Sequence, residues 1–331
     1  MKKRLFGRTE DGRAVDVVVL VSGDAAVAIL SYGCVVRDWR VDASGGSLPM
    51  VLGFPRLEDY VRHSRSHGAT VGRVANRTAN SRFELEGKTW EVTPSEGRHH
   101  LHGGKVGLGN RIWTMETDSG SGTVQLAYQS PDGEEGYPGA VDFRVTFRLE
   151  GPRLICEMSG MPDRPTPINL ANHNYYNLGG SGTVKDHLLW VDAEAYTVTD
   201  AELIPTGEIR PLEGTPLDFS KEREIGDTWI DNNLVLREGR DQNRPAARVR
   251  CPRTGIRLEL WTDEPGLQLF DASEMTIGTP GHDGQSYGLY AGLCLEAQHH
   301  PDSMNRPDWP SIVSTPERPY FQRLVVEIGK E

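Results

Sequence analysis

Alternation of apolar and polar residues is the feature that most restricts how this chain can fold. From Val141 to Leu149 every second residue is apolar, and the alternation resumes from Leu154 to Met158 after a turn at Gly151-Pro152. A period of two is typical of a strand with one face buried, whereas an α-helix repeats about every 3.6 residues. Two such runs on either side of a short turn predict a β-hairpin.

Two more segments have the same pattern. Phe83 to Val92 alternates around a turn at Glu86-Gly87-Lys88, and Val249 to Leu260 alternates around Thr254-Gly255. Helical periodicity is weak, and its best example is the short stretch from Leu57 to Val61. The 331 residues include 37 glycines and 21 prolines, which suits many tight turns. The sequence therefore predicts an all-β fold with few short helices. Because no linker separates the strands, it also predicts a single domain over residues 1–331.

Charge and hydropathy exclude several classes of partner. Lys and Arg number 36 against 47 Asp and Glu, a formal net charge of −11, so we expect no nucleic acid held by phosphate contacts. No apolar run approaches the length of a membrane span, so we expect no membrane partner. The basic start is not followed by the apolar region of a signal peptide, which predicts a cytoplasmic protein unless a signal has been removed.

The four cysteines stand far apart in the sequence. None belongs to a C-x-x-C pair of the kind found in zinc ribbons and redox motifs, so we expect buried free thiols. They are Cys34, Cys156, Cys251 and Cys294.

Three segments interrupt the strand pattern by concentrating polar residues among glycines and aromatics, as sites built on a rigid sheet often do. The first is Gly72 to Arg77, followed downstream by Leu101 to Gly104. The second, Ile168 to Leu178, contains four asparagines, a histidine and two tyrosines. The third, Leu289 to Gln298, is an apolar run that ends on a carboxylate and an amide. A pocket walled by amide and guanidinium groups would suit a polyhydroxylated ligand.

Two of these residues are candidates for acid and base chemistry. If Leu289 to Gln298 is one strand, Glu296 shares a face with Gly292 and Cys294, where poor hydration would raise its pKa and make it a usable base. The alternative is that the strand has emerged into solvent and Glu296 is an ordinary exposed acid, and the segment alone does not decide between the two. His173 titrates near neutrality and could donate a proton, although a lone histidine in a strand is more often structural.

Other constellations do not point to a site. The chain has no dinucleotide fingerprint, no phosphate loop and no G-x-S-x-G nucleophile elbow. Five further histidines could meet in space, but nothing in their spacing requires a metal. We therefore expect neither a cofactor nor a metal. These histidines are His99, His100, His102, His299 and His300.

The polar segments follow one another in a recognisable order. The most specific are Asn172-His-Asn-Tyr-Tyr-Asn-Leu178 and Leu295-Glu-Ala-Gln298. The others are Val71–Arg77, Leu101–Gly104, Gly133–Gly139, Pro205–Glu208 and Asp231–Leu236. In order and spacing, from Phe6 to Tyr320, the chain resembles the aldose 1-epimerase (galactose mutarotase) family. The resemblance implies a large antiparallel β-sandwich of the galactose mutarotase-like supersandwich type.

The resemblance also implies a function. It is the interconversion of the α and β anomers of a free hexose such as glucose or galactose, without a cofactor, in a monomer or homodimer. By position, Glu296 would remove the proton from the sugar's C1 hydroxyl and His173 would protonate the ring oxygen. The ring then opens, rotates about C1–C2 and closes on the other face. The residues implied to bind the substrate are Asn76, Arg77, His102, Asp231 and Gln268.

Departures from the family pattern leave the preferred aldose and two alternative functions open. His99, Asn232, Asp271 and Ser273 differ from the residues that are common in the family, which predicts an altered rim. One alternative is a hexose-6-phosphate 1-epimerase of similar fold, which would need a basic phosphate clamp. The other is a non-catalytic carbohydrate-binding protein. A glycosidase fits less well, because most glycosidases use two carboxylates.

Overall fold

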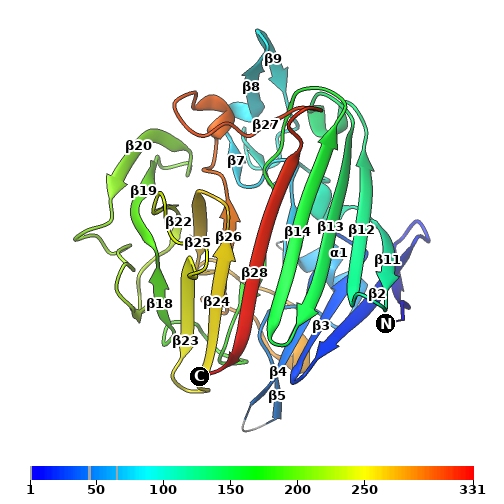
Figure 1. Ribbon diagram of the computed structural model, residues 1–331, viewed down its shortest axis with the longest axis vertical. Helices are drawn as coiled ribbons and strands as arrows, with labels where there is room; N and C mark the ends of the chain where they lie inside the picture. The colour runs from blue at the N-terminus through cyan, green and yellow to red at the C-terminus, as the bar shows by residue number, and fades with distance from the viewer. Residues whose placement is uncertain (1, 44–45, 65) are drawn as a thin grey trace.

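The computed structural model describes residues 2–43, 46–64 and 66–331, and almost all of the regular structure is β (Figure 1). The one α-helix among these residues is α1 (Leu57–His63), where the sequence predicted a short helix. Within the same ranges, no helix is both long and apolar enough to span a bilayer. The 3-10 helices are η1 (Ala79–Ser81), η2 (Leu108–Asn110), η3 (Glu134–Gly136), η4 (His282–Gly284) and η5 (Ser303–Asn305).

The largest sheet has nine strands, and all of its neighbouring strands are antiparallel. Two of the predicted hairpins, β13–β14 and β23–β24, lie within it, with their turns where the sequence placed them. In spatial order the strands are β11 (Thr114–Asp118), β12 (Thr123–Ser130), β13 (Val141–Glu150), β14 (Arg153–Pro162), β28 (Tyr320–Lys330), β24 (Ile256–Thr262), β23 (Ala247–Cys251), β18 (Leu188–Val191) and β21 (Arg223–Glu224).

Two smaller sheets of five and six strands complete the main architecture. The five-stranded sheet contains β1 (Arg4–Arg8), β2 (Ala14–Ser22), β3 (Ala25–Leu30), β4 (Val36–Ala43) and β5 (Gly46–Pro49). The six-stranded sheet contains, in spatial order, β17 (Tyr175–Tyr176), β26 (Leu293–Gln298), β25 (Gly266–Phe270), β22 (Asp231–Leu236), β19 (Ala193–Thr199) and β20 (Pro205–Pro211).

The described residues also form four two-stranded pairs. The third predicted hairpin is one of them, β8–β9. The pairs are β6 (Thr70–Val71) with β16 (Ala171–Asn172), β7 (Arg77–Thr78) with β10 (His100–Leu101), β8 (Arg82–Leu85) with β9 (Lys88–Glu91), and β15 (Thr166–Pro167) with β27 (Val313–Ser314).

One apolar cluster joins the three large sheets. Alternate residues of β13, including Phe143 and Phe147, point inward and share this cluster with Trp39 of β4 and with Leu267 and Leu295 of the six-stranded sheet. The nine-stranded sheet therefore forms one layer, and the two smaller sheets pack against it. This is the predicted β-sandwich, with side chains of the inner faces filling the space between the layers. That the whole chain is a single domain stays a prediction.

Strand β26 brings the sequence's main base candidate into the interior. Leu293 and Leu295 face the apolar cluster, so Cys294 and Glu296 face the other side of the sheet. The strand is shorter than the one considered from the sequence, because Tyr290 has a left-handed φ of 61° that ends extended structure there. Leu289 is accordingly 51% exposed.

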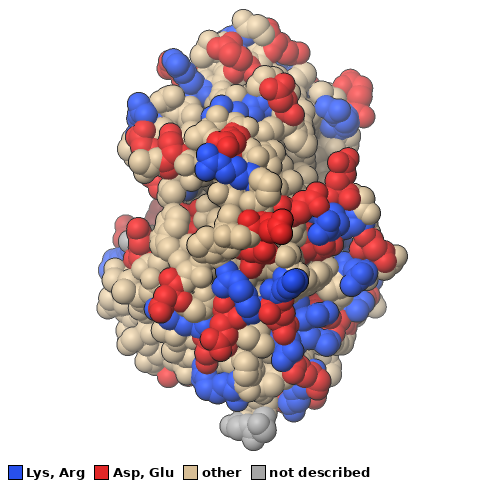
Figure 2. Space-filling view, turned by 90° about the vertical axis from the view of Figure 1, so that its left-hand side faces the viewer, with Lys and Arg blue, Asp and Glu red and all other residues tan. Residues whose placement is uncertain are grey.

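The charge on one face bears on the expected absence of a nucleic-acid partner, which stays a prediction. Figure 2 shows acidic and basic side chains interspersed over the face that it presents. With a net charge of −11 distributed in this way, that face offers no broad basic area for a phosphate backbone.

Candidate active site

All seven residues singled out in the sequence line one cavity of about 360 Å³, a size that suits a small ligand. They come from β7 and the residue before it, from the turn after β10, from the segment between β16 and β17, and from three strands of the six-stranded sheet. The residues are Asn76, Arg77, His102, His173, Asp231, Gln268 and Glu296.

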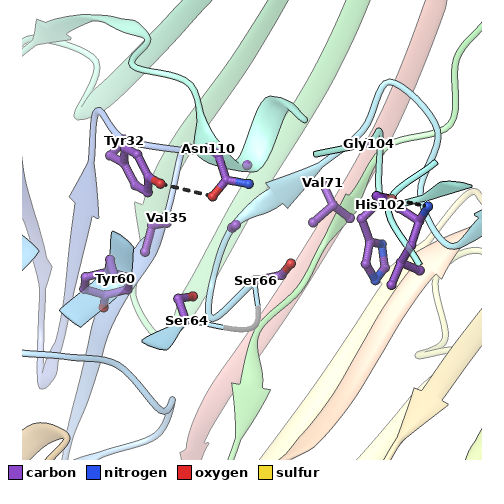
Figure 3. Close-up of a pocket in the computed structure, with 13 residues that line it drawn as sticks. Tyr32, Val35, Tyr60, Ser64, Ser66, Val71, His102, Gly104 and Asn110 are labelled. Carbon is purple, nitrogen blue, oxygen red and sulfur yellow. Dashed lines mark hydrogen bonds between the residues drawn. The ribbon is translucent and has the colours of Figure 1, made fainter. Parts of the chain in front are cut away.

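A smaller cavity of about 170 Å³ adjoins the first (Figure 3). The two share Ser66, Leu101 and His102 in their walls. On its far side the smaller cavity is bounded by Tyr32, whose hydroxyl donates to Asn110 Oδ1 at 3.0 Å. His102 therefore lines both spaces.

Glu296 is a buried carboxyl and not an exposed acid. Its residue is 2% exposed, and Oε2 has no hydrogen-bond partner among the described residues. Burial raises the pKa of Glu296 to about 8, the nearby charge of Asp231 adds to this effect, and Arg77 opposes it. The alternative left open by the sequence, a strand that emerges into solvent at this point, is therefore wrong.

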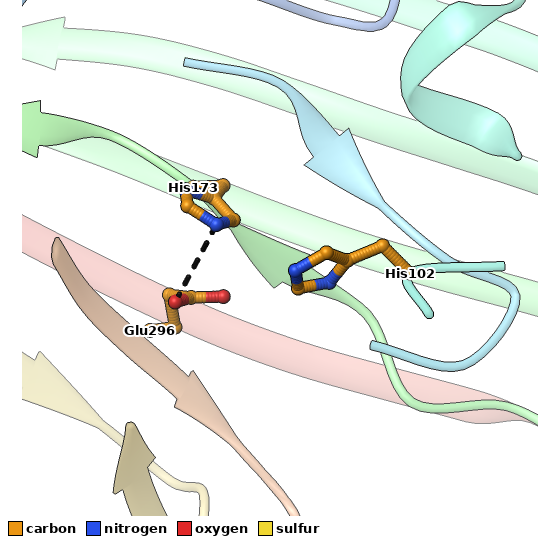
Figure 4. A group of neighbouring side chains, drawn as sticks. All are labelled: His102, His173 and Glu296. Carbon is orange, nitrogen blue, oxygen red and sulfur yellow. Dashed lines mark ion pairs between the residues drawn. The ribbon is translucent and has the colours of Figure 1, made fainter. Parts of the chain in front are cut away.

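His173 lies opposite Glu296 (Figure 4). Its Nε2 is 3.7 Å from Glu296 Oε1, and its side chain is 6% exposed. The backbone fixes its position, since His173 N–H donates to Ala69 O and its carbonyl accepts from Gly68 N–H. Burial lowers the pKa of His173 to about 4. The two groups that the sequence suggested as base and acid thus face each other within reach of one small ligand.

The asparagines around His173 turn out to support the fold and do not line the cavity. Asn177 Nδ2 donates to the carbonyls of Gly182 and Ala291, and Asn174 Nδ2 donates to the hydroxyl of Tyr176. These bonds compensate for part of the burial of the amides, while Asn172 Nδ2 and Asn174 Oδ1 have no hydrogen-bond partner among the described residues. The expectation of a pocket walled by amides holds at Asn76 and Gln268 only, among the described residues.

His102 has a tautomer set by the backbone. Its Nδ1 accepts the N–H of Asn76 at 3.1 Å, so in the neutral ring Nε2 carries the proton and acts as a donor. Burial lowers the pKa of His102 well below its usual range, which keeps the ring neutral. Gly103 allows the tight turn that follows, because a Cβ there would lie 1.7 Å from Gly72 O.

Two further pairs complete the polar wall. Arg77 donates to both oxygens of Glu96, at 2.5 and 3.0 Å. Gln268 Nε2 donates to Asp231 Oδ1 at 2.7 Å, and Gln268 lies opposite Glu296 in the strand register. Guanidinium, amide and carboxyl groups held in this way can pair with several hydroxyl groups at once.

A metal does not suit this cluster, although His102, His173 and Glu296 place one ligand atom each within 4.8 Å of one another. Ligating histidines donate their other ring N–H to an acceptor. His102 instead accepts a backbone N–H at Nδ1, so its free nitrogen is protonated and cannot ligate. His99, His100, His299 and His300 belong to no metal-ligating group among the described residues.

Sequence reasoning missed part of the cavity wall. Trp229 lines the cavity and is 48% exposed, and the carboxyl of Glu274 lies in the same wall. Tyr175 also lines the cavity and stacks on His67 at 4.5 Å between ring centroids. The one available signal for Trp229 was its position two residues before Asp231. His67 itself is fully buried.

Three of the four departures from the family pattern lie away from this cavity. Of the described residues His99, Asn232, Asp271 and Ser273, only Ser273 lines it. His99 Nδ1 accepts the N–H of Asn80, and Asp271 accepts the N–H groups of Ile230 and Ser273. Of these four described residues, Ser273 alone belongs to the cavity wall, and an altered rim stays a prediction.

Comparison with known proteins shows the family and agrees with the fold. The sequence profile described as "Aldose 1-epimerase" matches residues 16–327. The chain is 37% identical over 329 residues to galactose mutarotase from Rattus norvegicus, covering 96% of this chain and 95% of that protein. It is 30% identical over 312 residues to aldose 1-epimerase from Haemophilus influenzae, covering 90% and 91%. A crystal structure of a GalM/aldose epimerase homologue from C. elegans superposes with a TM-score of 0.90 at 28% identity, covering 96% of this chain and 99% of that one.

Proposed function

The chain belongs to the aldose 1-epimerase family, an isomerase family that acts on carbohydrates, and we propose that it interconverts the α and β anomers of free hexoses such as glucose and galactose at the cavity around Glu296 and His173. The observation that carries this proposal is the 3.7 Å approach of His173 Nε2 to Glu296 Oε1 inside a cavity of about 360 Å³. A carboxyl and an imidazole at this separation can act on two oxygens attached to the same carbon.

The reaction requires one proton to be removed and one to be supplied. Glu296 takes the proton of the C1 hydroxyl while His173 gives a proton to the ring oxygen, and the bond between C1 and the ring oxygen breaks. The aldehyde rotates about C1–C2, and the C5 hydroxyl attacks the opposite face. His173 then takes back the C5 hydroxyl proton and Glu296 protonates the carbonyl oxygen. Each positioned proton transfer accelerates such a step roughly 10²- to 10⁴-fold.

Substrate binding changes which residue of the pair carries the proton. In the empty cavity burial disfavours both charged forms, since it raises the pKa of Glu296 to about 8 and lowers that of His173 to about 4. At neutral pH the proton therefore resides on the carboxyl. A sugar that donates its C1 hydroxyl to Glu296 and offers its ring oxygen to His173 stabilises carboxylate and imidazolium by hydrogen bonds. The proton then passes from Glu296 to His173.

The remaining cavity residues hold the sugar. His102 donates through Nε2, because its Nδ1 is engaged by the backbone of Asn76. Asp231 accepts and Arg77 donates, while Gln268 and Asn76 can pair with hydroxyls through their amides. These groups are arranged before the ligand arrives, which reduces the entropy lost on binding.

A hexose 6-phosphate fits this cavity poorly. Among the described residues in its lining, Arg77 is the one Lys or Arg side chain, and both its Nε and its Nη2 donate to Glu96. The carboxyls of Glu96, Asp231, Glu274 and Glu296 lie in the same wall. A phosphate placed here would meet more negative than positive charge, so this alternative loses support.

The direct test is polarimetry on freshly dissolved α-D-glucose, α-D-galactose and a pentose. We expect the purified protein to accelerate the mutarotation of at least one hexose, and α-D-glucose 6-phosphate to react much more slowly. Calorimetric binding of a hexose without any acceleration would support the carbohydrate-binding alternative and contradict the proposal. A cytoplasmic location and a monomeric or homodimeric state stay predictions, which fractionation and light scattering can check.

A further inference from the structure

Cys294 lies directly behind the imidazole of His173. Its Sγ is 3.5 Å from His173 Nδ1, and its residue is fully buried. Cys294 stands two positions before Glu296 on β26, so both side chains leave the same face of the strand. One strand thus supplies both the proposed base and the neighbour of the proposed acid.

We propose that Cys294 is a positioning residue for His173, accepting a hydrogen bond from Nδ1–H so that the neutral ring keeps an unprotonated Nε2 toward the cavity. This inference rests on the role of His173 in the proposed function. A neutral imidazole has one donor and one acceptor nitrogen, and the partner of one nitrogen decides the state of the other. His102 shows the opposite arrangement, since its Nδ1 is an acceptor.

The reaction needs this tautomer. When imidazolium gives its Nε2 proton to the ring oxygen, the proton that remains is on Nδ1, and that N–H requires an acceptor. The thiol sulfur lies 3.5 Å from Nδ1 and can accept this proton, beside the backbone carbonyl of His173 itself, which also hydrogen-bonds to the ring. In the reverse step Nε2 must take a proton from the C5 hydroxyl, and a ring with its proton on Nε2 could not do so.

A thiol also suits an acid that must release its proton easily. Sulfur is a weak acceptor, so it orients the ring while stabilising imidazolium less than a carboxylate would. Burial raises the pKa of the Cys294 thiol well above its usual range, so the group stays neutral. The other polar and titratable groups around His173 are Glu296 on β26, the ring of His102 at 5.1 Å between centroids and that of Tyr175 at 5.0 Å.

The variants Cys294→Ala and Cys294→Ser test the proposal, with Cys251→Ala as a matched control. Cys251 is another buried thiol, whose Sγ lies within 4.8 Å of a ring nitrogen of His187. For Cys294→Ala we expect kcat to fall roughly tenfold to a hundredfold while KM changes less than about twofold, because the acid is misplaced and the sugar contacts remain. Cys294→Ser should restore part of kcat. Its stronger acceptor should also move the acidic limb of the kcat–pH profile to higher pH.

Nitrogen NMR reads the tautomer without any turnover. His173, assigned by comparison with His173→Asn, should show the proton on Nδ1 in the wild type and a mixture of tautomers in Cys294→Ala. A wild-type ring with its proton on Nε2 would overturn the proposal, as would an unchanged kcat and pH profile in Cys294→Ala. An equal loss in Cys251→Ala would also overturn it, since the effect would then be general loosening. If the wild type accelerates no mutarotation, the proposed function fails, and the tautomer measurement still decides the role of Cys294.

Discussion

Two clusters of the same residue types lie in different parts of this protein. The cavity cluster consists of His102, His173 and Glu296, with the thiol of Cys294 behind it. The packed cluster consists of Asp186, His187 and Cys251. Each places its ligand atoms within 4.8 Å of one another, and each combines buried imidazole with a carboxyl and a thiol.

The packed cluster has no hydrogen-bonding capacity left on its histidine. His187 Nε2 accepts the N–H of Leu178 at 3.0 Å, and Nδ1 lies 2.9 Å from Asp186 Oδ1. Both ring nitrogens are used, and the ring links the residue before β18 to the segment that follows β17. The residue types alone would have suggested a site, whereas their hydrogen-bond partners show that the cluster stabilises the fold.

The cavity cluster keeps free capacity where a ligand can reach it. Glu296 Oε2 has no partner among the described residues, and His173 Nε2 and Glu296 Oε1 face a cavity of about 360 Å³. Polar atoms without hydrogen-bond partners beside a cavity therefore distinguish a candidate site from a structural cluster of similar composition. Buried polar groups left in this way reduce stability, so they persist where function needs them.

The largest expected effect comes from removing the acid or the base. Glu296→Gln and His173→Asn should each lower kcat roughly 10²- to 10⁴-fold, because each removes one proton transfer from ring opening. Polarimetry measures the loss, and circular dichroism checks the fold. The double variant should lose little more than either single one, because the two residues act as a unit. Near-wild-type rates in either single variant would show that the roles are wrongly assigned.

Neutralising one carboxylate in the cavity wall and one in the packed cluster should separate the two regions next. Asp231→Asn should lower kcat/KM roughly tenfold to a hundredfold, mainly through KM, because a charged acceptor for a sugar hydroxyl is lost. It should also lower the pKa of Glu296, since the charge of Asp231 helps to raise it. The basic limb of the pH–rate profile would move to lower pH. Asp186→Asn, the matched change in the packed cluster, should leave kcat, KM and the profile unchanged.

The packed cluster should respond in stability. His187→Ala should reduce the free energy of unfolding by about 1–3 kcal/mol, because the buried N–H of Leu178 loses its acceptor. Its kcat should stay within about twofold of the wild type, as expected of a residue that takes no part in the reaction. Chemical denaturation and polarimetry measure the two quantities. A large loss of kcat with an unchanged free energy of unfolding would contradict a purely structural role for this cluster.

In the cavity cluster, by contrast with His187→Ala, removing a titratable side chain should raise the free energy of unfolding at high pH. The pKa of Glu296 is about 8 in the folded protein against a usual value of 4.5, so the folded state binds more protons between these pH values. Wild-type stability therefore falls as pH rises from about 4.5 to 8. Glu296→Gln has no such proton to lose, and at pH 8 it should be more stable than the wild type by on the order of 1 kcal/mol or more. Equal stability of the two proteins across this pH range would argue that Glu296 is ionised when folded.

The smallest expected effect is that of chelation. Treatment with EDTA should leave kcat unchanged, because His102 and His187 each accept a backbone N–H on one ring nitrogen and thus hold their protons on the other. The other nitrogen of His102 is thus a donor, and that of His187 is engaged by Asp186, so neither suits a metal. A loss of activity that added zinc restores would show that one of the clusters does bind metal.

The sequence predicted local structure well where neighbouring residues decide it. The hairpins β13–β14, β23–β24 and β8–β9 and the short helix α1 follow from alternation and turn residues. The residues of the cavity were named from a family resemblance, and all seven line it. Trp229 and Glu274 were missed, because nothing in their own segments shows that those segments meet Glu296.

The sequence alone determined the strand pairs, the turns, the presence of an acid and a base, and the absence of a strong metal or cofactor motif. The tertiary structure decided that Glu296 is buried, that Asn177 supports the fold, and that His173 keeps its Nε2 toward the cavity. The reason is physical. Alternation is a property of adjacent residues, whereas hydration and hydrogen-bond partners depend on distant segments, as His173 and Cys294 meet across 121 positions of the chain.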